Sequence, residues 1–240
     1  FVHPFEDPAV IAGQGTIGIE LLEDELARPA DTVLCPVGGG GLIGGLACCL
    51  KERNPALRII GVEAETCAGM KAALAYGGPR LLPRAGSLAD GIAVRQVGVM
   101  THALAARYVD QVVTVSEDQV ANAVLLLLDI EKIVVEGAGA TPLAAALAHP
   151  ELVAGRRVVS IVSGGNIDMN ILQRIIGRGL AVAGRTAHLE LRLRDTPGAL
   201  GAVLGIVSGL GANILEIDHH RFDAPAPFGF VDLTLTVETR

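Results

Sequence analysis

Short apolar runs that are typical of strands alternate with helix-like segments along the first 180 residues. Strands are expected at residues 32–37, 58–62 and 158–162, and helices at 7–27, 42–52 and 116–130. Only 3% of the residues are aromatic, so Ala, Val, Leu and Ile must build the core. Such alternation predicts an α/β fold in which helices cover both faces of a parallel sheet.

Two of the expected helices carry start signals. Asp7 is a cap-type residue and Pro8 follows it at the first helical position, where proline is well tolerated. Ser116 stands three residues before Gln119, the spacing of a capping box. We therefore expect both helices to begin at these residues.

The pattern changes after residue 176. Residues 177–184 are rich in glycine and predict a linker. Beyond them, polar and leucine residues alternate over 188–194, and a helix at 198–210 precedes strands at 213–219 and 230–237. We expect two domains, residues 1–180 and a β-α-β-β unit at 185–240.

Charge and composition exclude several classes of partner. The formal net charge is 19 − 26 = −7 and there is no basic run, which argues against nucleic acid. No apolar stretch is long enough to span a bilayer, and no targeting segment is visible, so we expect a cytoplasmic chain. The four cysteines form no C-x-x-C pair and are expected to be buried, reduced thiols.

Four consecutive glycines join an expected strand to an expected helix. They are Gly38, Gly39, Gly40 and Gly41. Bare main-chain N–H groups at a helix N-terminus favour a phosphate. Two glycines would serve a tight turn alone, so four favour anion binding. No Gly-Lys-Ser/Thr follows, which excludes a P-loop, whereas Glu63 leaves a dinucleotide site open.

A second glycine motif, SGGN at residues 163–166, follows the expected strand at 158–162. Ligands of open α/β sheets collect at such strand ends. A hydroxyl before two glycines also suits an ordinary turn, so this motif alone does not choose between the two readings.

Taken together, the motifs resemble those of threonine dehydratases, which are fold-type II pyridoxal-phosphate enzymes close to serine racemase. Besides the glycine loop, the matching segments are FVHPFEDP at 1–8, IAGQGT at 11–16, ADGIA at 89–93, EGAGA at 136–140 and SGGN at 163–166. The resemblance covers residues 1–180. DTPGAL at 195–200 and GANI at 211–214 resemble an ACT domain. Together these resemblances imply part of a fold-type II parallel sheet with helices on both faces, followed by an incomplete ferredoxin-like (ACT) α+β domain.

The resemblance also implies roles for individual residues. The four loop glycines would hold the phosphate of pyridoxal 5'-phosphate, Ser163 would hydrogen-bond the pyridine nitrogen, and Glu136 would lie near the ring. Asp90 and Gly91 would line the substrate pocket, with His3 and Phe5 as its wall. Without the resemblance, Asp90 is a turn cap and Glu136 a solvated helix end.

The implied activity is ammonia release from threonine or serine, giving 2-oxobutanoate or pyruvate. The Schiff-base lysine of such enzymes has no counterpart among Lys51, Lys71 and Lys132, so no catalytic residue is assigned. We expect that lysine upstream of this sequence, and residues 1–240 alone to be inactive. The alternatives are serine racemase, another fold-type II lyase, or a non-catalytic amino-acid-binding module.

Two further sites follow from the resemblance. Glu63 and Cys67 stand where serine racemase binds a cation, although Gly69 replaces a second acidic ligand; Glu63 is otherwise a solvated carboxylate at a strand end. An amino-acid effector would bind residues of the C-terminal unit, namely Asp195, Pro197, Gly198 and Asn213. The expected partners are an amino-acid substrate, that effector and further copies of the chain, without nucleic acid or membrane.

Overall fold

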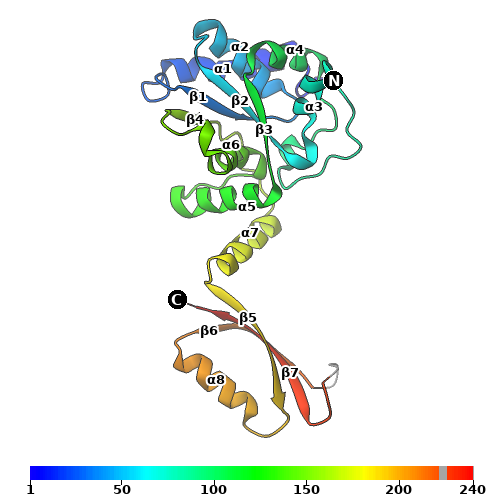
Figure 1. Cartoon of the computed structure of the whole chain (residues 1–240), viewed down its shortest axis with the longest axis vertical. Coiled ribbons are helices and arrows are strands. Elements are labelled where there is room, and N and C mark those ends of the chain that lie inside the picture. Colours follow the sequence, from blue (N-terminus) through cyan, green and yellow to red (C-terminus); the bar gives the residue numbers. More distant parts are fainter. Residues whose placement is uncertain (222–225, 240) are drawn as a thin grey trace. The chain divides into compact units, whose positions relative to one another are not determined.

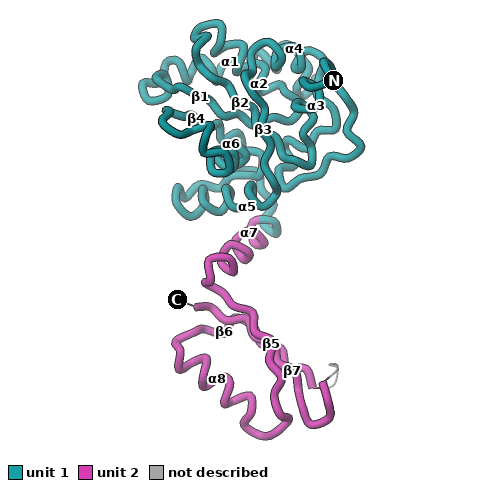
Figure 2. Tube along the Cα trace, in the orientation of Figure 1, with its two compact units in different colours: residues 1–171 teal, residues 172–240 magenta. Residues whose placement is uncertain are grey.

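The computed structural model describes residues 1–221 and 226–239. Contacts divide the chain into two compact units, Phe1–Ile171 and Leu172–Arg240 (Figure 2). This division falls inside a helix, and each unit has a sheet and a core of its own.

The sheet of the first unit has four strands in the order β3-β2-β1-β4 (Figure 1). All of its pairings are parallel, which confirms the predicted parallel sheet. The strands are β1 (Thr32–Pro36), β2 (Arg58–Ala64), β3 (Gln111–Val115) and β4 (Val158–Ser160). The sequence analysis missed β3, and β4 ends two residues earlier than expected.

Helices flank this sheet on two sides. They are α1 (Pro8–Glu23), α2 (Gly41–Arg53), α3 (Gly69–Tyr76), α4 (Val99–Tyr108), α5 (Glu117–Leu126) and α6 (Gly137–Ala148). Helix α6 contacts β1, β2 and β3, and Figure 1 shows it across the sheet from α1, α2 and α4. Short helical turns complete the unit: η1 (Glu65–Cys67), η2 (Asp90–Ile92), the π-helix η3 (Leu127–Glu131) and η4 (Pro150–Leu152).

Both predicted helix starts are confirmed. The Asp7 carboxylate accepts a hydrogen bond from the N–H of Ala9 at 2.8 Å. Ser116 and Gln119 form the reciprocal capping box. Helix α1 ends at Glu23 rather than near 27, because Asp24 leaves the helical conformation and its carboxylate accepts from two following N–H groups instead.

The four cysteines are free thiols, as predicted, but only Cys35 and Cys67 are buried; Cys48 and Cys49 are half-buried. Burial raises the pKa of the Cys35 thiol well above its usual range. A buried, protonated thiol at this position is inert packing material.

The predicted linker is a helix. Helix α7 (Met169–Val182) runs through Gly177 and Gly179, and among the glycines of this stretch only Gly184 has a positive φ, +67°. The N–H groups of Gly184 and Arg185 bond back to carbonyls of the last turn, which ends the helix. The linker prediction was therefore wrong. It relied on the number of glycines, although the helical spacing of apolar residues before Gly177 continues past it.

The second unit has the predicted β-α-β-β order. Its elements are β5 (Thr186–Arg194), α8 (Ala199–Gly209), β6 (Asn213–His220) and β7 (Phe230–Glu238). Both β5 and β6 pair antiparallel with β7, which is central. Buried Leu233 and Leu235 of β7 pack with Val207 of α8.

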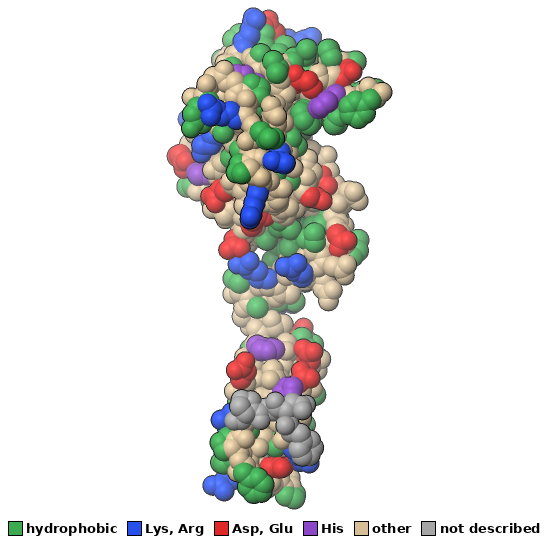
Figure 3. All heavy atoms as spheres, turned by 90° about the vertical axis from the view of Figure 1, so that its right-hand side faces the viewer, with side chains coloured by type: hydrophobic (Ala, Val, Ile, Leu, Met, Phe, Trp, Pro, Cys, Tyr) green, Lys and Arg blue, Asp and Glu red, His purple; other side chains and the backbone are tan. Residues whose placement is uncertain are grey.

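Acidic and basic side chains are interspersed on the face shown in Figure 3, without a patch of one sign. Across the described residues, no helix is both long and apolar enough to cross a membrane.

Candidate cofactor site

The loops that follow β1 and β4 leave the sheet at the same edge. Thr32 pairs in parallel with Val158, and the N–H of Ile161 donates to the carbonyl of Leu34 at 3.0 Å. The glycine loop at residues 38–41 and the SGGN segment at 163–166 therefore start side by side. This is the strand end at which open α/β sheets bind ligands.

Close packing requires all four glycines of the loop. A Cβ on Gly38 would lie 2.9 Å from the Cα of Ile92, and one on Gly39 would overlap the ring of Phe5. Gly41 approaches the backbone of Phe5 equally closely, and Gly40 has φ +96°, where side chains are strained. Our inference that four glycines exceed what packing needs was wrong, so the case for an anion rests on hydrogen bonding instead.

Two carbonyls of the loop are occupied by protein donors, whereas its N–H groups have no protein acceptor among the described residues. The carbonyl of Gly39 accepts from Thr101 Oγ1 at 2.7 Å, and that of Gly40 accepts from the N–H of Gly44 at 2.8 Å. Within the described part of the chain, the N–H groups of residues 38–41 donate to no protein acceptor. Four free donors at the N-terminus of α2 fit a phosphate group.

Glu136 lies at the centre of a second cluster. It is half-buried at the N-cap of α6, and its N–H donates to the carbonyl of Gly164 at 3.1 Å. A Cβ on Gly91 would lie 3.3 Å from Glu136 Oε1, and one on Gly164 would overlap the carboxylate. Glu136 thus stands at a helix end, as the residues alone suggested, but it is half-buried and two glycines border its carboxylate.

One short segment joins this cluster to the glycine loop. It is η2, in which Ile92 packs on Gly38 while the neighbouring Gly91 faces Glu136. Asp90 at its start is exposed, and its Oδ1 accepts from the N–H of Gly91 at 2.8 Å. The carboxylate thus caps the turn and remains open to solvent beside the cluster.

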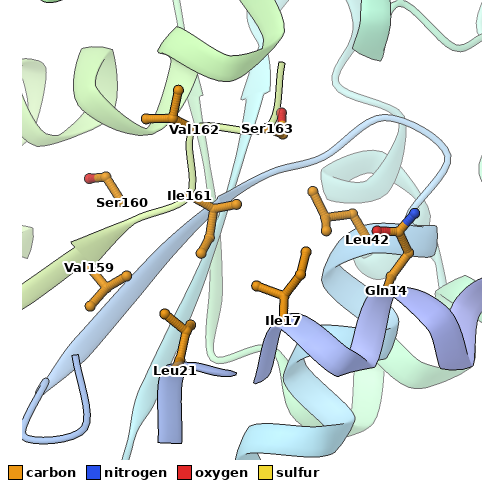
Figure 4. Close-up of a pocket in the computed structure, with 9 residues that line it drawn as sticks. All are labelled: Gln14, Ile17, Leu21, Leu42, Val159, Ser160, Ile161, Val162 and Ser163. Carbon is orange, nitrogen blue, oxygen red and sulfur yellow. The ribbon is translucent and has the colours of Figure 1, made fainter. Parts of the chain in front are cut away.

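Ser163 has an exposed side chain with no hydrogen bond to any described residue. It lines a pocket together with Gln14, Ile17, Leu21, Leu42, Val159, Ser160, Ile161 and Val162. Figure 4 shows Ser163 just beyond β4, with Leu42 of α2 and Gln14 of α1 across the pocket. Because Leu42 directly follows the glycine loop, the pocket connects Ser163 with that loop.

Glu63 lies near the end of β2, as expected, but its role differs from each one that we considered. Its side chain is fully buried, and its two oxygens accept from the N–H groups of Met70 at 2.7 Å and Lys71 at 2.9 Å. Burial raises the pKa of this carboxyl to about 7, although these hydrogen bonds partly offset the shift. Glu63 is therefore a helix cap for α3, not a solvated carboxylate or a ribose ligand.

The expected cation site gains no support. Cys67 was expected to offer its main-chain carbonyl rather than its thiol, and the buried thiol donates to the carbonyl of Ile92 at 3.8 Å. No cluster of three or more His, Cys, Asp or Glu side chains in the described residues could hold a metal ion. A hard dication needs several oxygen ligands, and Glu63 has committed both of its own.

None of the three lysines belongs to this site. Lys51 forms an ion pair with Asp110 at 2.8 Å, Lys71 is exposed near Thr114, and Lys132 is exposed beside Asp129. The structure therefore agrees with assigning none of them a catalytic role.

The predicted effector residues divide between the two ends of α8. Gly198, with φ +88°, directly precedes the helix, and Asp195 Oδ1 accepts from Arg221 at 2.8 Å instead of capping it. Pro197 also lies before the helix. Asn213 follows the helix, where it lines a pocket with Ser208 and Glu238. Eleven helical residues span about 16 Å, so one ligand cannot reach both groups within one unit.

Two residues that the sequence analysis overlooked contact the glycine loop or its support. Thr101 bonds the loop from α4, and Glu6 bonds the start of α4. Glu6 stands in the FVHPFEDP segment, but no role was predicted for it, and Thr101 lies in no motif; only the fold brings the two residues to the loop.

The family described as "Pyridoxal-phosphate dependent enzyme" matches residues 1–164. The L-threonine ammonia-lyases of Thermotoga maritima and Geobacter sulfurreducens are 46% and 43% identical over the whole chain, which spans 59% of each. Threonine deaminase isoform 2 of Solanum lycopersicum has a similar structure, with TM-score 0.70 and 36% identity over 73% of this chain and 51% of that one.

The family match and the site agree on one cofactor. Pyridoxal phosphate carries a phosphate group and a pyridine ring, and the chain offers a loop of free N–H groups beside a cluster that contains Glu136 and leads to Ser163. The match also covers every residue of the two clusters except Gly165 and Asn166 in the SGGN segment. The chain belongs to the pyridoxal-phosphate-dependent enzyme family.

Proposed function

We propose that this protein is a threonine ammonia-lyase, which eliminates water from threonine or serine and takes up water again as it releases ammonia, so that the net products are 2-oxobutanoate or pyruvate and ammonia. The observation that carries the proposal is the glycine loop: four main-chain donors without protein acceptors stand at the helix that faces Ser163. Two relatives named L-threonine ammonia-lyase match along the entire chain and support the choice of reaction.

In this proposal the N–H groups of residues 38–41 bind the cofactor phosphate. The N-terminal end of α2 adds a favourable dipole. The carbonyls of Gly39 and Gly40 accept hydrogen bonds from the protein, so these two acceptors are not directed at the phosphate. This anchoring fixes the position of the ring relative to the pocket.

Two side chains act on the ring. The Ser163 hydroxyl would hydrogen-bond the pyridine nitrogen, and Glu136, whose carboxylate is bordered by Gly91 and Gly164, would lie near the ring. A hydroxyl is too weak an acid to protonate the nitrogen, so the ring stays neutral. When bound, pyridoxal phosphate supplies the electron sink for loss of the substrate's α-proton and β-hydroxyl.

Asp90 and Gly91 border the substrate. Gly91 leaves room between the loop and Glu136, and the exposed Asp90 carboxylate provides an acceptor for a polar substrate group.

The second unit senses an amino acid in this proposal, as an ACT-type domain. Asp195, Pro197 and Gly198 border the effector carboxylate at the N-terminal end of α8, where the helix dipole favours an anion, and Asn213 binds its amino group. Because these groups lie at opposite ends of α8, the site needs two copies of the unit. The proposal therefore includes a homo-oligomer.

Substitution of Ser163 tests the ring assignment in the full-length protein. Ser163→Ala removes one neutral hydrogen bond and should slow release of 2-oxobutanoate roughly tenfold. Ser163→Asp should slow it further, because a carboxylate favours a protonated nitrogen, and should shift the absorbance of the bound cofactor. An Asp variant with unchanged rate and absorbance would exclude Ser163 as the ring partner.

A further inference from the structure

Helix α4 contacts the glycine loop through one buried side chain. Thr101 is completely buried, and the shorter of its two hydroxyl contacts, 2.7 Å, is to the carbonyl oxygen of Gly39; the other is 3.2 Å to that of Gly98. The N–H of Gly98 donates to the same Gly39 oxygen at 3.3 Å. The first turn of α4 thus holds this oxygen with two donors.

Holding that oxygen also fixes the direction of an N–H group. In a trans peptide the C=O of one residue and the N–H of the next point in opposite directions. With the Gly39 oxygen bound to α4, the N–H of Gly40 points away from α4, where no protein acceptor meets it. Glycine backbones change conformation easily, so without this bond the peptide could turn its oxygen outward, towards the phosphate.

Glu6 holds α4 in place for this contact. Its Oε1 accepts from the N–H of Met100 at 2.7 Å, and its Oε2 from that of Thr101 at 3.5 Å. A Cβ on Gly98 would overlap this carboxylate, so the glycine there permits the approach. Glu6 therefore caps a helix that begins more than ninety residues later in the chain.

The residues next to Glu6 also contact the glycine loop. Phe5 packs on Gly39 and Gly41 so closely that neither position can carry a side chain. His3 Nδ1 accepts from the N–H of Glu6 at 3.1 Å, and its ring meets that of Phe5 edge-on at 4.5 Å. The segment at residues 3–6 and helix α4 therefore both contact the loop, and they also contact each other.

We propose that Thr101, held by Glu6, is a positioning residue for the cofactor phosphate: it orients the Gly39–Gly40 peptide so that its N–H faces the anion. This inference rests on the proposed role of the loop. It assigns Thr101 no contact with the cofactor, because the side chain acts on the side of the loop that faces the protein.

The test compares the affinities of the full-length protein for pyridoxal 5'-phosphate and for pyridoxal, which lacks the phosphate. Thr101→Val keeps the shape of the side chain and removes its donor, whereas Thr101→Ser keeps the donor. Thr32→Val is the matched control, because Thr32 is also fully buried but its hydroxyl has no partner in the described structure.

Thr101→Val should reduce the preference for pyridoxal phosphate over pyridoxal roughly tenfold, with little change in the affinity for pyridoxal. Thr101→Ser and Thr32→Val should keep the preference of the unchanged protein. A Thr101→Val protein that loses affinity for both ligands equally, or keeps the full preference, would overturn the positioning role.

The ligand preference of the unchanged protein distinguishes failure of this inference from failure of the proposed phosphate loop. If it shows no preference for the phosphorylated ligand, the proposed phosphate loop itself is wrong. If it shows the preference and Thr101→Val leaves it intact, the loop binds phosphate without help from Thr101. Should Thr101→Val prove unstable, loss of the preference in Thr101→Ser would equally contradict a role that depends on the hydroxyl.

Discussion

At the scale of single residues, two buried or half-buried glutamates organise the surroundings of the glycine loop. Glu63 caps α3, whose Met70 packs its side chain against Gly40, and Glu6 caps α4, whose Thr101 bonds Gly39. Each carboxylate satisfies N–H groups that a helix start leaves unpaired. The loop is therefore supported from two helices whose starts are fixed by charged side chains.

Glu63 should make the stability of the protein depend on pH. Its pKa is about 7 in the folded state against an ordinary 4.5, so the folded protein binds the proton more tightly than the unfolded chain. The free energy of unfolding must then fall as pH rises from about 4.5 to about 7, by up to ~3 kcal/mol. Glu63→Gln should remove this part of the pH dependence.

Urea unfolding at pH 5 and pH 8 measures the effect, with the change between the two pH values compared across variants. Glu25→Gln, at an exposed position, serves as the control and should behave like the unchanged protein. If Glu63→Gln shows the same loss of stability between pH 5 and pH 8 as the control, Glu63 does not titrate in this range.

Capping residues could be predicted from the sequence only where they directly precede their helix. Asp7 and Ser116 were predicted correctly from neighbouring residues. For Glu63 a cation ligand, a ribose ligand and a solvated carboxylate were left open, because nothing near it in the chain reveals that its carboxylate accepts from the N–H groups of Met70 and Lys71. Contacts across the fold decide the role of a buried carboxylate, and one sequence does not contain them.

At the scale of elements, α7 shows how a strong apolar period can outweigh glycine. Gly177 and Gly179 lie inside the helix and have no positive φ; Gly177 is exposed and Gly179 is half-buried. Each glycine costs a helix roughly 0.5–1 kcal/mol relative to alanine, and this cost did not break the helix. Gly184, in contrast, ends it in the left-handed conformation.

The two kinds of glycine should respond oppositely to alanine. Gly177→Ala should raise the free energy of unfolding by roughly 0.5–1 kcal/mol, since a Cβ there would meet no atom within 4 Å and alanine favours helix. Gly184→Ala should lower it by roughly 1 kcal/mol, because alanine strains at positive φ. Urea unfolding of both variants tests this, and a neutral Gly177→Ala would return the stretch to a flexible linker.

At the scale of the whole molecule, each unit carries a separate task in our account. The first contains the clusters around the glycine loop and Glu136, and the second contains a β-α-β-β sheet with candidate effector residues at both ends of α8. Regulation then requires two copies of the second unit, because its groups are too far apart within one.

Asn213→Ala tests this division of labour. In the full-length protein it should weaken the response to a branched-chain amino acid or serine about tenfold, the loss of one or two hydrogen bonds, and leave basal activity unchanged. Calorimetry that detects no amino acid bound outside the active site would leave the second unit a role in dimerisation only.

The sequence predicted the layers of the molecule well and its site in part. Alternation of short apolar runs was sufficient for the parallel sheet, and the period-two leucines predicted β5. The motifs around Asp90, Glu136 and Ser163 were recognised, but their arrangement about Gly91 and Gly164 depends on close approaches that no spacing reveals. The missed strand β3 begins with polar Gln111, which weakened its signal.

The most direct test of the account is ammonia and 2-oxo-acid release from threonine by the full-length protein with pyridoxal phosphate. We predict 2-oxobutanoate release at an ordinary enzymatic rate, about 1–10³ per second, and none from residues 1–240 alone, because none of its lysines lies at the site. Binding of pyridoxal phosphate without release of 2-oxobutanoate or pyruvate, or interconversion of serine enantiomers as the dominant reaction, would contradict the proposed function.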